Sequence, residues 1–481
     1  MNRIAPAAPA MKLESAPSAP GDAGMKIDAA PSAPGGAGWK EIGLRSWGRS
    51  QVANALVARP ERMRELHAAL RDRGPAGSRA LLPRGAARSY GDVCLNADGS
   101  VILTERLNRI LSFDDTSGLL VAEPGVTFAD LLAVFLPRGF RVPASPGTSF
   151  VTIGGAVAND IHGKNQHVAG CFGDCVEWLD LLCADGSVQR LSPTQNTALF
   201  DATIGGIGLT GIITAVCIRM VPVPSPALLV RRRRVGGLDE FLEGFAQADS
   251  MPFSVGWIDV LASGAALGRG ILETAEPAPR GAVAPPPPRA KRMPIDLPAW
   301  ALNGASVRAF NALYWRRAQP EAREAVSNYV QFLYPLDAIT DWNRLYGRRG
   351  FNQFQCVVPY EGGAAAVKRL LRTASAGGGA SFLAVLKVMG RGGRGLLSFA
   401  QPGYSLALDF AAGANTTELF RALEHITRDA GGRIYLAKDA MMSRESFVAM
   451  YPNIDAFQQM RETVDPNHRF SSSMSRRLGL G

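Results

Sequence analysis

Apolar and polar positions alternate along the chain in blocks that predict a mixture of helices and strands. Residues 60–73 place apolar side chains near helical spacing, and residues 128–135 and 419–429 predict two further helices. Residues 351–358 alternate with a period of two, which is typical of a strand. Residues 178–191 predict a hairpin around the turn Asp185-Gly186.

Residues 151–173, VTIGGAVANDIHGKNQHVAGCFG, are the stretch around which the chain is organised. The pattern predicts a strand, a turn and a helix, followed by a dense polar cluster that holds two of the chain's five histidines. Paired glycines let a backbone approach a phosphate or a ring closely, because no Cβ intervenes. Taken alone, the stretch is compatible with a ligand site and equally with a solvated polar loop.

Three loops of small residues, 85–92, 143–156 and 204–211, lie within one segment of mixed helices and strands. The first follows a predicted strand and ends in hydroxyls and charges, so it is a plausible phosphate cradle. It matches neither a GxGxxG fingerprint nor a Walker loop. A long cofactor crossing a domain needs several close backbone approaches, whereas a small ligand does not.

Two glutamines, Gln353 and Gln355, share one face of the predicted strand 351–358. Buried amides need hydrogen-bond partners. The strand is therefore either exposed at a sheet edge or lines a polar pocket.

Composition narrows the classes of partner. The 481-residue chain has a net charge of +10, which suits a phosphorylated ligand, an anionic membrane or nucleic acid. Arginines 231–234 form a basic run that could also be a solvated strand end. Zinc-finger spacing and a basic groove-binding helix are both missing from the sequence, so we expect no nucleic-acid partner. Six thinly spread cysteines predict reduced thiols and no metal site.

The sequence contains no signal-peptide pattern and no apolar run of about 18 residues. We therefore expect a cytoplasmic protein, and association with the inner face of the plasma membrane is compatible with this pattern.

Composition also predicts the domain organisation. Residues 1–38 are rich in Ala, Pro, Ser and Gly and contain a tandem repeat (11–24 against 25–38), which predicts a disordered tail. A proline-rich composition break follows at 222–226. Four consecutive prolines at 285–288 predict a mobile loop, which is either a linker or a basic lid facing a membrane. The predicted segments are a tail (1–38), a first domain (39–222), a second domain (223–410) with a mobile loop (274–300), and a C-terminal segment (411–481) that completes the second domain and returns to the first; the resemblance described next implies that the first is an FAD-binding domain and the second a substrate-binding domain.

Several blocks in order carry a family resemblance that covers nearly everything beyond the tail. The blocks are 88–92, 151–156, 160–165, 205–213, 334–337 and 437–439. They resemble the flavin oxidoreductases of the vanillyl-alcohol-oxidase type, and more closely the decaprenylphosphoryl-β-D-ribose 2′-oxidases. The resemblance implies an α+β fold of two domains, in which an FAD-binding domain is capped by an antiparallel-sheet substrate domain.

The resemblance also implies roles for individual residues. Lys438 would lie beside the N1–C2 edge of the flavin, where a cation stabilises developing negative charge. His162 and Tyr90 would complete the catalytic group, with His162 either accepting a proton or orienting the flavin. The implied FAD contacts are Arg84, Gly85, Ala86, Ala87, Arg88, Ser89, Pro146, Gly147, Thr148, Thr152, Gly154, Gly155, Ala158, Asn159, His162, Gly163, Gly208, Gly211, Ile213, Tyr435 and Lys438. The implied substrate contacts are Lys164, Tyr334, Gln353, Gln355, Lys387, Ser405 and Ala407, and Lys387 would suit the substrate's phosphate.

Four positions depart from the wider family pattern. Arg88 stands where many relatives have a histidine bonded covalently to the flavin, so we expect non-covalent FAD. Ala87 replaces a common glycine. Ala407 stands at a position that is often a cysteine, which predicts that covalent trapping by nitroaromatic inhibitors fails. Ser405 replaces a common asparagine, so the sugar could differ.

The implied function is oxidation of the 2′-hydroxyl of a polyprenylphosphoryl-β-D-ribose to the 2-keto sugar. This is the first half of an epimerisation to the arabinose donor used in cell-wall or glycan synthesis. A separate NAD(P)-dependent keto-reductase would complete it. The alternatives are an aldonolactone or alditol oxidase acting on a free sugar, and a non-catalytic flavoprotein.

Overall fold

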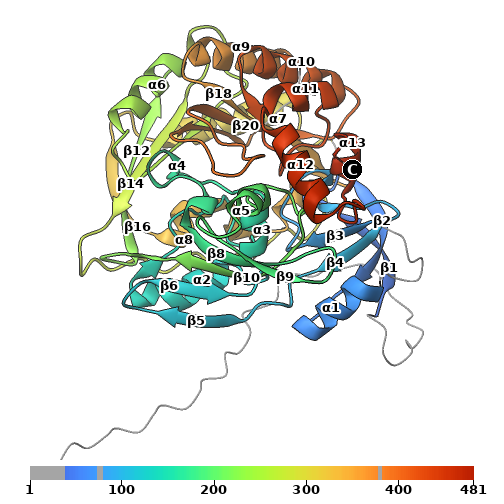
Figure 1. Cartoon of the computed structure of the whole chain (residues 1–481). Helices are drawn as coiled ribbons and strands as arrows, with labels where there is room; N and C mark the ends of the chain where they lie inside the picture. Colours follow the sequence, from blue (N-terminus) through green and yellow to red (C-terminus); the bar gives the residue numbers. More distant parts are fainter. Residues whose placement is uncertain (1–37, 73–79, 299, 378–381, 481) are drawn as a thin grey trace, which may run out of the picture. The chain divides into compact units, whose positions relative to one another are not determined.

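The computed structural model describes residues 38–72, 80–298, 300–377 and 382–480. The predicted disordered tail therefore lies outside the described residues, apart from Gly38. Three sheets of four, five and eight strands organise this part of the chain (Figure 1). None of the helices in the described ranges combines the length and apolarity needed to cross a bilayer.

The four-stranded sheet is mixed, since β1 and β2 pair antiparallel while β4 pairs in parallel with β2 and β3. Its strands in spatial order are β1 (Lys40–Arg45), β2 (Val52–Ala58), β4 (Ser100–Leu103) and β3 (Leu81–Arg84). Helix α1 (Met63–Asp72) buries Leu66, Ala69 and Leu70 in the apolar cluster that also contains strand residues Leu81 and Ile102.

The five-stranded sheet is antiparallel throughout. Its order is β5 (Ile110–Asp114), β6 (Leu119–Ala122), β10 (Ile212–Arg219), β8 (Val176–Leu182) and β9 (Val188–Leu191). The predicted hairpin is confirmed as the pair β8 and β9. Four helices lie in this part of the chain: α2 (Phe128–Phe135), α3 (Ile153–Ala158), α4 (Gln166–Ala169) and α5 (Thr197–Thr203). The two-stranded pair of β7 (Phe140–Arg141) and β11 (Val221–Pro222) closes this part of the fold.

The predicted strand at the start of 151–173 is wrong, because the segment turns directly into helix α3. Thr152 caps the helix by accepting a hydrogen bond from the Gly155 N–H at 3.3 Å. Ile153, Ala156 and Val157 are fully buried, and their i, i+3, i+4 spacing is that of a helix.

The eight-stranded antiparallel sheet forms the upper half of Figure 1, with helices on its outer face. Its order is β16 (Arg323–Asn328), β12 (Ala227–Val235), β14 (Gly270–Pro277), β13 (Phe253–Ile258), β19 (Ala384–Met389), β20 (Gly403–Ala411), β18 (Phe351–Pro359) and β21 (Arg433–Ile434). The covering helices are α6 (Leu238–Gln247), α9 (Gly363–Ala376) and α10 (Thr416–Asp429). Phe354, Cys356 and Val358 of β18 share one apolar core with residues of these helices.

Arginines 231–234 form the last part of β12, directly before its final residue Val235, and their side chains are half-buried. Three of them form ion pairs with glutamates, such as Arg231 with Glu276 at 3.0 Å on the neighbouring strand β14. These ion pairs with glutamates therefore neutralise much of the positive charge of the arginines.

The proline-rich segment is only partly irregular. Thr274 to Pro277 belong to β14, and β15 (Lys291–Arg292) pairs in parallel with β17 (Ile339–Thr340). The mobility of this segment and the domain boundaries at 222 and 410 stay predictions. Helices α7 (Gly304–Arg317) and α8 (Tyr329–Leu333) follow in the chain.

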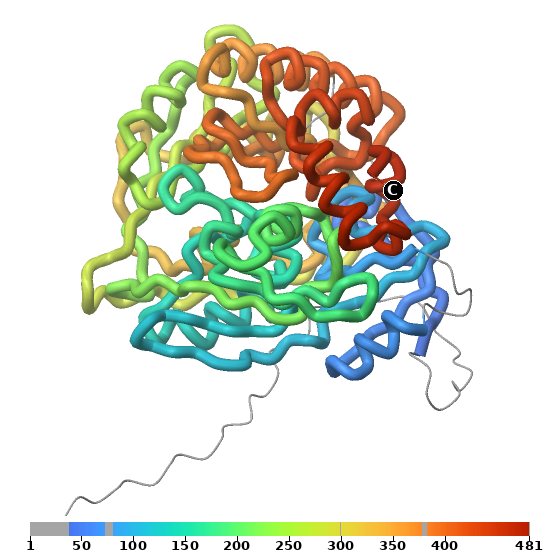
Figure 2. The backbone as a smooth tube through the Cα atoms, in the orientation of Figure 1, coloured from blue at the N-terminus to red at the C-terminus, as the bar shows by residue number. Residues whose placement is uncertain are grey.

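The C-terminal segment returns to the beginning of the chain. After α11 (Arg444–Met450) come α12 (Ile454–Val464) and α13 (Ser473–Arg477), which lie beside the strands of the first sheet (Figure 2). Leu81 of β3 donates its N–H to Arg469 O at 2.7 Å and accepts the Ser471 N–H at 2.9 Å. The last residues therefore join the first sheet directly.

Candidate functional site

The inner face of the eight-stranded sheet carries polar side chains. Gln355 Nε2 lies 2.9 Å from His162 Nε2, and Gln353 donates to the Asp409 carboxylate. Both glutamines are buried. They do not lie at an exposed sheet edge, so that alternative is wrong, and the polar pocket stays a prediction. The register places Gln353 opposite Asp409 and Gln355 opposite Ala407.

The three small-residue loops meet next to this face. A Cβ on Gly85 would overlap Thr152 Oγ1, and one on Gly208 would lie 3.3 Å from Pro83 Cγ. The Ile207 N–H donates to Ala158 O at 2.8 Å. Segments that are distant in the chain therefore meet around helix α3.

Several predicted glycines make room for other protein segments. A Cβ on Gly154 would lie 2.6 Å from Pro124 Cβ, and one on Gly163 would overlap the Ser145 carbonyl oxygen. A Cβ on Gly211 would lie 2.8 Å from Leu182 O. Gly147 differs, because a Cβ there would meet nothing within 4 Å among the described residues. Of these, Gly147 alone leaves the surface open for a ligand.

Lys438 and Tyr90 lie in direct contact. The Lys438 ammonium sits 3.4 Å from the centre of the Tyr90 ring, and the Tyr90 N–H donates to Ala437 O at 3.0 Å. Burial lowers the pKa of Lys438, and the nearby Asp409 carboxylate opposes this shift. Burial likewise raises the pKa of Asp409, while Lys438 and Gln353 favour its charged form. A half-buried cation next to a buried acid results.

His162 is enclosed by aromatic rings and cations. Phe399 and Tyr435 lie with ring centres 5.2 and 5.0 Å away, and the Tyr435 hydroxyl donates to Asn159 O at 3.0 Å. Burial, Lys387 and Lys438 hold the pKa of His162 well below its usual value. The imidazole is therefore neutral near pH 7, as expected for a proton acceptor.

A second group of cations lies along the same face. Burial and Lys164 lower the pKa of Lys387 to about 8. Lys164 donates to the Phe332 carbonyl and lies 4.2 Å from the centre of the Phe332 ring. The register places Lys387 opposite Ser405, whose buried hydroxyl has no hydrogen-bond partner among the described residues. This arrangement presents positive charge and donors to an anionic, polar ligand.

Unpartnered buried polar atoms mark where a large polar ligand would fit. Within the described ranges, these atoms around the three loops are Arg84 Nε and Nη1, Arg88 Nε, Asn159 Oδ1, His162 Nδ1 and Asn165 Oδ1. Buried polar groups without partners are costly, so they are expected to bind something. A mixed set of donors and acceptors fits FAD, which carries phosphates, hydroxyls and a polar ring edge.

Other predicted residues bond to or pack against neighbouring protein segments, although the Tyr334 hydroxyl has no hydrogen-bond partner among the described residues. The Thr148 hydroxyl donates to Asp337 at 2.7 Å, and Thr152 caps α3. Ile213 packs in the apolar core of the five-stranded sheet. Tyr334 is buried in an apolar cluster with Tyr329, and burial raises its pKa.

Arg88 and Ala87 have distinct local geometry. The Arg88 guanidinium lies over the rings of Trp47 (4.3 Å) and Phe150 (4.9 Å). Ala87 has a φ of 51°, a left-handed conformation that glycine adopts more easily. The glycine common at this position therefore has a structural reason.

Sequence reasoning missed Asp409 and Ser254. Asp409 lies two residues after Ala407 on β20, hence on the same face, and strand alternation could have identified it. The Ser254 N–H donates to Lys164 O at 2.8 Å, and its buried hydroxyl is unpartnered in the described part of the chain. Nothing local in the sequence distinguishes this serine.

Comparisons with known proteins agree with this geometry. The family model "FAD binding domain" matches residues 54–192, and the model "D-arabinono-1,4-lactone oxidase" matches residues 407–478. The chain is 36% identical to decaprenylphosphoryl-beta-D-ribose oxidase of Mycolicibacterium smegmatis over 91% of this chain and 97% of the relative. The chain belongs to the decaprenylphosphoryl-β-D-ribose oxidase family. As a member, it is an FAD-dependent oxidoreductase with an α+β fold of the vanillyl-alcohol-oxidase type.

Two further relatives of this chain give less information about the substrate. A Streptomyces coelicolor protein described as an uncharacterized protein in the mprA 5′ region is 35% identical over 74% of this chain and its own full length. A putative D-arabinono-1,4-lactone oxidase of Neurospora crassa is 28% identical over 36% of this chain and 30% of its own. Membership of the oxidase family contradicts the alternative of a non-catalytic flavoprotein.

Proposed function

We propose that the protein oxidises the 2′-hydroxyl of a polyprenylphosphoryl-β-D-ribose to the 2-keto sugar. This reaction is the first half of an epimerisation to an arabinose donor for cell-wall or glycan synthesis. The observation that carries the proposal is the match of 36% identity across 91% of the chain with a protein named for this oxidation. The half-buried lysines of the inner face support it, because the substrate contains a phosphate.

The residues at the site divide the work as follows. FAD, when bound, supplies the hydride acceptor. Lys438 would stabilise the negative charge that develops on a bound flavin, and the Tyr90 ring holds its ammonium in place. His162 is neutral and is the proposed acceptor of the hydroxyl proton. Reception at Nδ1 requires that Nε2 carry the ring proton and donate it to Gln355 Oε1, with the amide turned from the orientation in which its Nε2 faces the ring.

The substrate would lie along the inner face of the eight-stranded sheet. We propose that Lys387 and Lys164 bind its phosphate and that Gln353, Gln355 and Ser405 bind the sugar hydroxyls. Support comes from their common face and from the lowered pKa of Lys387, which reports an enclosed cation. Ala407 and Tyr334 would contribute shape, since both are buried.

We propose that FAD is held without a covalent bond. Arg88 stands at the position of the flavin-linked histidine, and a guanidinium stacked on Trp47 is not a nucleophile. Acid precipitation should release free FAD into the supernatant. Colour that stays in the pellet would contradict this proposal.

We further propose that the protein works at the inner face of the plasma membrane. Seven of the thirteen exposed large apolar side chains in the described residues lie between positions 283 and 339, including Trp300 (75% exposed) and Ile295 (60%). Positions 280–349 also carry eleven Lys or Arg against five Asp or Glu. Exposed apolar and basic side chains together favour an anionic lipid surface. A separate NAD(P)-dependent keto-reductase would meet the product there.

Vesicle sedimentation tests the membrane contact. Vesicles of phosphatidylglycerol should retain the protein at low salt, and vesicles of phosphatidylcholine should retain much less. Trp300→Ser should weaken retention, while Val448→Ser, at an exposed apolar position (46%) outside residues 283–339, should not. Equal retention of both variants would count against this surface.

Anaerobic titration with a polyprenylphosphoryl ribose tests the main proposal. Substrate should bleach the visible flavin band, and a free pentose should not. Bleaching by free sugars alone would instead favour the second candidate, an aldonolactone or alditol oxidase. The match of residues 407–478 to the D-arabinono-1,4-lactone oxidase model is the observation that keeps this candidate.

A further inference from the structure

Tyr90 and Lys438 are carried by segments 348 residues apart in the chain. The two segments touch through the Tyr90 N–H bond to Ala437 O, and Gly91 packs so closely on Asp439 that a Cβ would overlap the Asp439 carbonyl. A short displacement between these segments would separate the ammonium from the ring. The contact needs an element that holds both segments.

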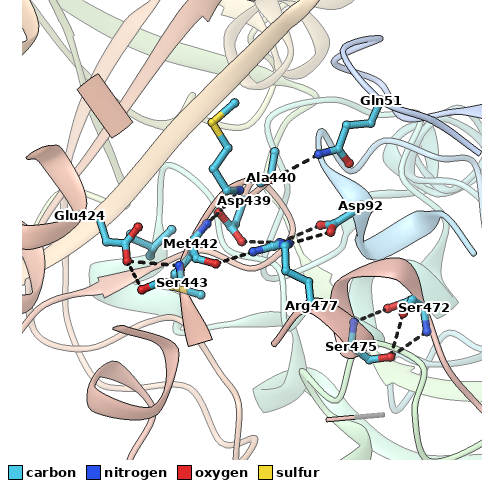
Figure 3. Close-up of polar contacts among 12 residues, drawn as sticks. Gln51, Asp92, Glu424, Asp439, Ala440, Met442, Ser443, Ser472, Ser475 and Arg477 are labelled. Carbon is cyan, nitrogen blue, oxygen red and sulfur yellow. Dashed lines mark hydrogen bonds and ion pairs between the residues drawn. The ribbon is translucent and has the colours of Figure 1, made fainter. Parts of the chain in front are cut away.

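Arg477 of helix α13 binds both segments, as Figure 3 shows. Its Nε and Nη2 donate to the two carboxylate oxygens of Asp92 at 2.8 Å each, and Nη2 also reaches Asp439 Oδ2 at 2.8 Å. Nη1 donates to Met442 O at 2.5 Å. The side chains of Asp92 and Asp439 are only 9% and 4% exposed, so these are enclosed ion pairs.

Asp439 connects Arg477 to the turn that bears Lys438. Its Oδ1 accepts the N–H groups of Met441 and Met442 at 2.9 and 2.8 Å, while Oδ2 binds Arg477. Asp92 stands two residues after Tyr90, and Asp439 stands directly after Lys438. The same guanidinium therefore fixes the residues next to both partners of the cation–ring contact.

We propose that Arg477 is a positioning residue, which holds the Lys438 ammonium over the Tyr90 ring by binding the two carboxylates beside them. The chain's last helix thereby sets the geometry of the catalytic group. This inference rests on the role proposed above for Lys438 at the flavin edge. A planar guanidinium suits the task, because its fork binds one carboxylate with two bonds and keeps a third donor for the other.

The neighbouring Arg476 provides a matched control. It also ties α13 to the segment after Tyr90, since Nη1 donates to Asn96 Oδ1 at 2.7 Å and Nη2 to Ala97 O at 3.1 Å. None of its bonds reaches Asp92 or Asp439 in the described structure. If Arg477 only stabilised the fold, substitution of either arginine should have the same effect on the flavin measurements.

The experiment compares Arg477→Lys with Arg476→Lys as FAD-bound proteins. Sulfite binds flavin N5 and places negative charge at the N1–C2 edge, so its affinity reports the cation there without using any sugar. Arg477→Lys should weaken sulfite binding about tenfold or more and slow flavin reduction by a similar factor, with KM nearly unchanged. Arg476→Lys should stay within about twofold of wild type in both measurements.

Four outcomes would overturn the proposal. One is wild-type sulfite affinity in Arg477→Lys, and another is an equal loss in both arginine variants. Asp439→Asn is the second variant in case Arg477→Lys does not fold, because its amide oxygen can still accept the Met441 and Met442 N–H groups. Wild-type sulfite affinity in a folded Asp439→Asn, or failure of both variants to fold, would also count against positioning. If the lipid-linked ribose leaves the wild type unreduced, the substrate proposal fails while the sulfite comparison still decides the role of Arg477.

Discussion

At the residue scale, the Lys438 ammonium over the Tyr90 ring is the contact with the clearest chemical consequence. Protein encloses the cation, and its field acts with little screening by water. Lys438→Ala should therefore lower the rate of flavin reduction by roughly 10²- to 10³-fold, the usual cost of removing one donor that stabilises developing charge. Rapid-mixing absorbance spectroscopy under anaerobic conditions measures this rate.

Two controls make that measurement specific. Tyr90→Phe keeps the ring under the ammonium and should lose much less than Lys438→Ala. Lys368→Ala removes an exposed lysine paired with Asp239 and should leave the rate unchanged. A Lys438→Ala protein that is folded, yellow and reduced at the wild-type rate would exclude the proposed role.

Backbone strain at Ala87 gives a second residue-scale prediction. A left-handed φ of 51° costs a residue with a Cβ about 1 kcal/mol relative to glycine. Ala87→Gly should therefore raise the free energy of unfolding by about 1 kcal/mol, as urea denaturation measures it. The neighbouring Ala86 has no positive φ, so Ala86→Gly should lower stability by about 0.5–1 kcal/mol. Destabilisation by Ala87→Gly would show that the strain is unimportant.

At the scale of elements, Asp160 joins helix α3 to the segment before β20. Its carboxylate accepts hydrogen bonds from the Gly173 N–H at 2.8 Å and from the Ser398 hydroxyl at 2.6 Å. Burial raises its pKa to about 6, above the value of about 3.8 for an unfolded aspartate. The folded state therefore binds the proton more tightly, and this group stabilises the protein most at acid pH.

The expected pH dependence follows from that sign. Asp160 contributes about 3 kcal/mol to the free energy of unfolding below about pH 4, and this contribution is lost as the pH rises through about 6. The unfolding free energy of wild type relative to Asp160→Asn should therefore fall between pH 4 and pH 7. Asparagine retains an acceptor for Gly173 and does not titrate, so a difference that stays flat would contradict this assignment.

Local patterns in the sequence predict some elements well and others poorly. The alternation with a period of two predicted strand β18 correctly. For Gln353 and Gln355 it left two alternatives, an exposed sheet edge or a polar pocket, and in the structure both side chains are buried beside polar partners. The start of 151–173 was mistaken for a strand, because a short apolar run does not distinguish a buried helix from a strand. The helical spacing of the buried residues 153, 156 and 157 is a property of the folded chain and could not be derived from the local sequence.

At the scale of the whole molecule, contacts between distant segments could not be predicted. The sheet order places β21 beside β18, and Arg477 reaches Asp92 across 385 positions. Such pairings depend on how the elements assemble, since no local pattern encodes a partner hundreds of residues away. The family blocks predicted Lys438, Tyr90 and His162 as one catalytic group, because shared ancestry records that assembly. The structure places the Lys438 ammonium over the Tyr90 ring, and the catalytic roles stay predictions.

Non-covalent FAD should also stabilise the assembled molecule. Unpartnered buried atoms that suit FAD come from loops of the first half of the chain, such as Arg88 Nε and Asn159 Oδ1, while Lys438 belongs to the last segment. A ligand that binds only the folded state adds RT ln(1 + [L]/Kd), about 2.7 kcal/mol at a hundredfold excess over Kd. Thermal unfolding of apoprotein should therefore shift to higher temperature as FAD is added. Arg88→Ala should reduce the shift, and Arg476→Lys should not. An unfolding temperature independent of FAD would mean that the cofactor does not bind between these segments.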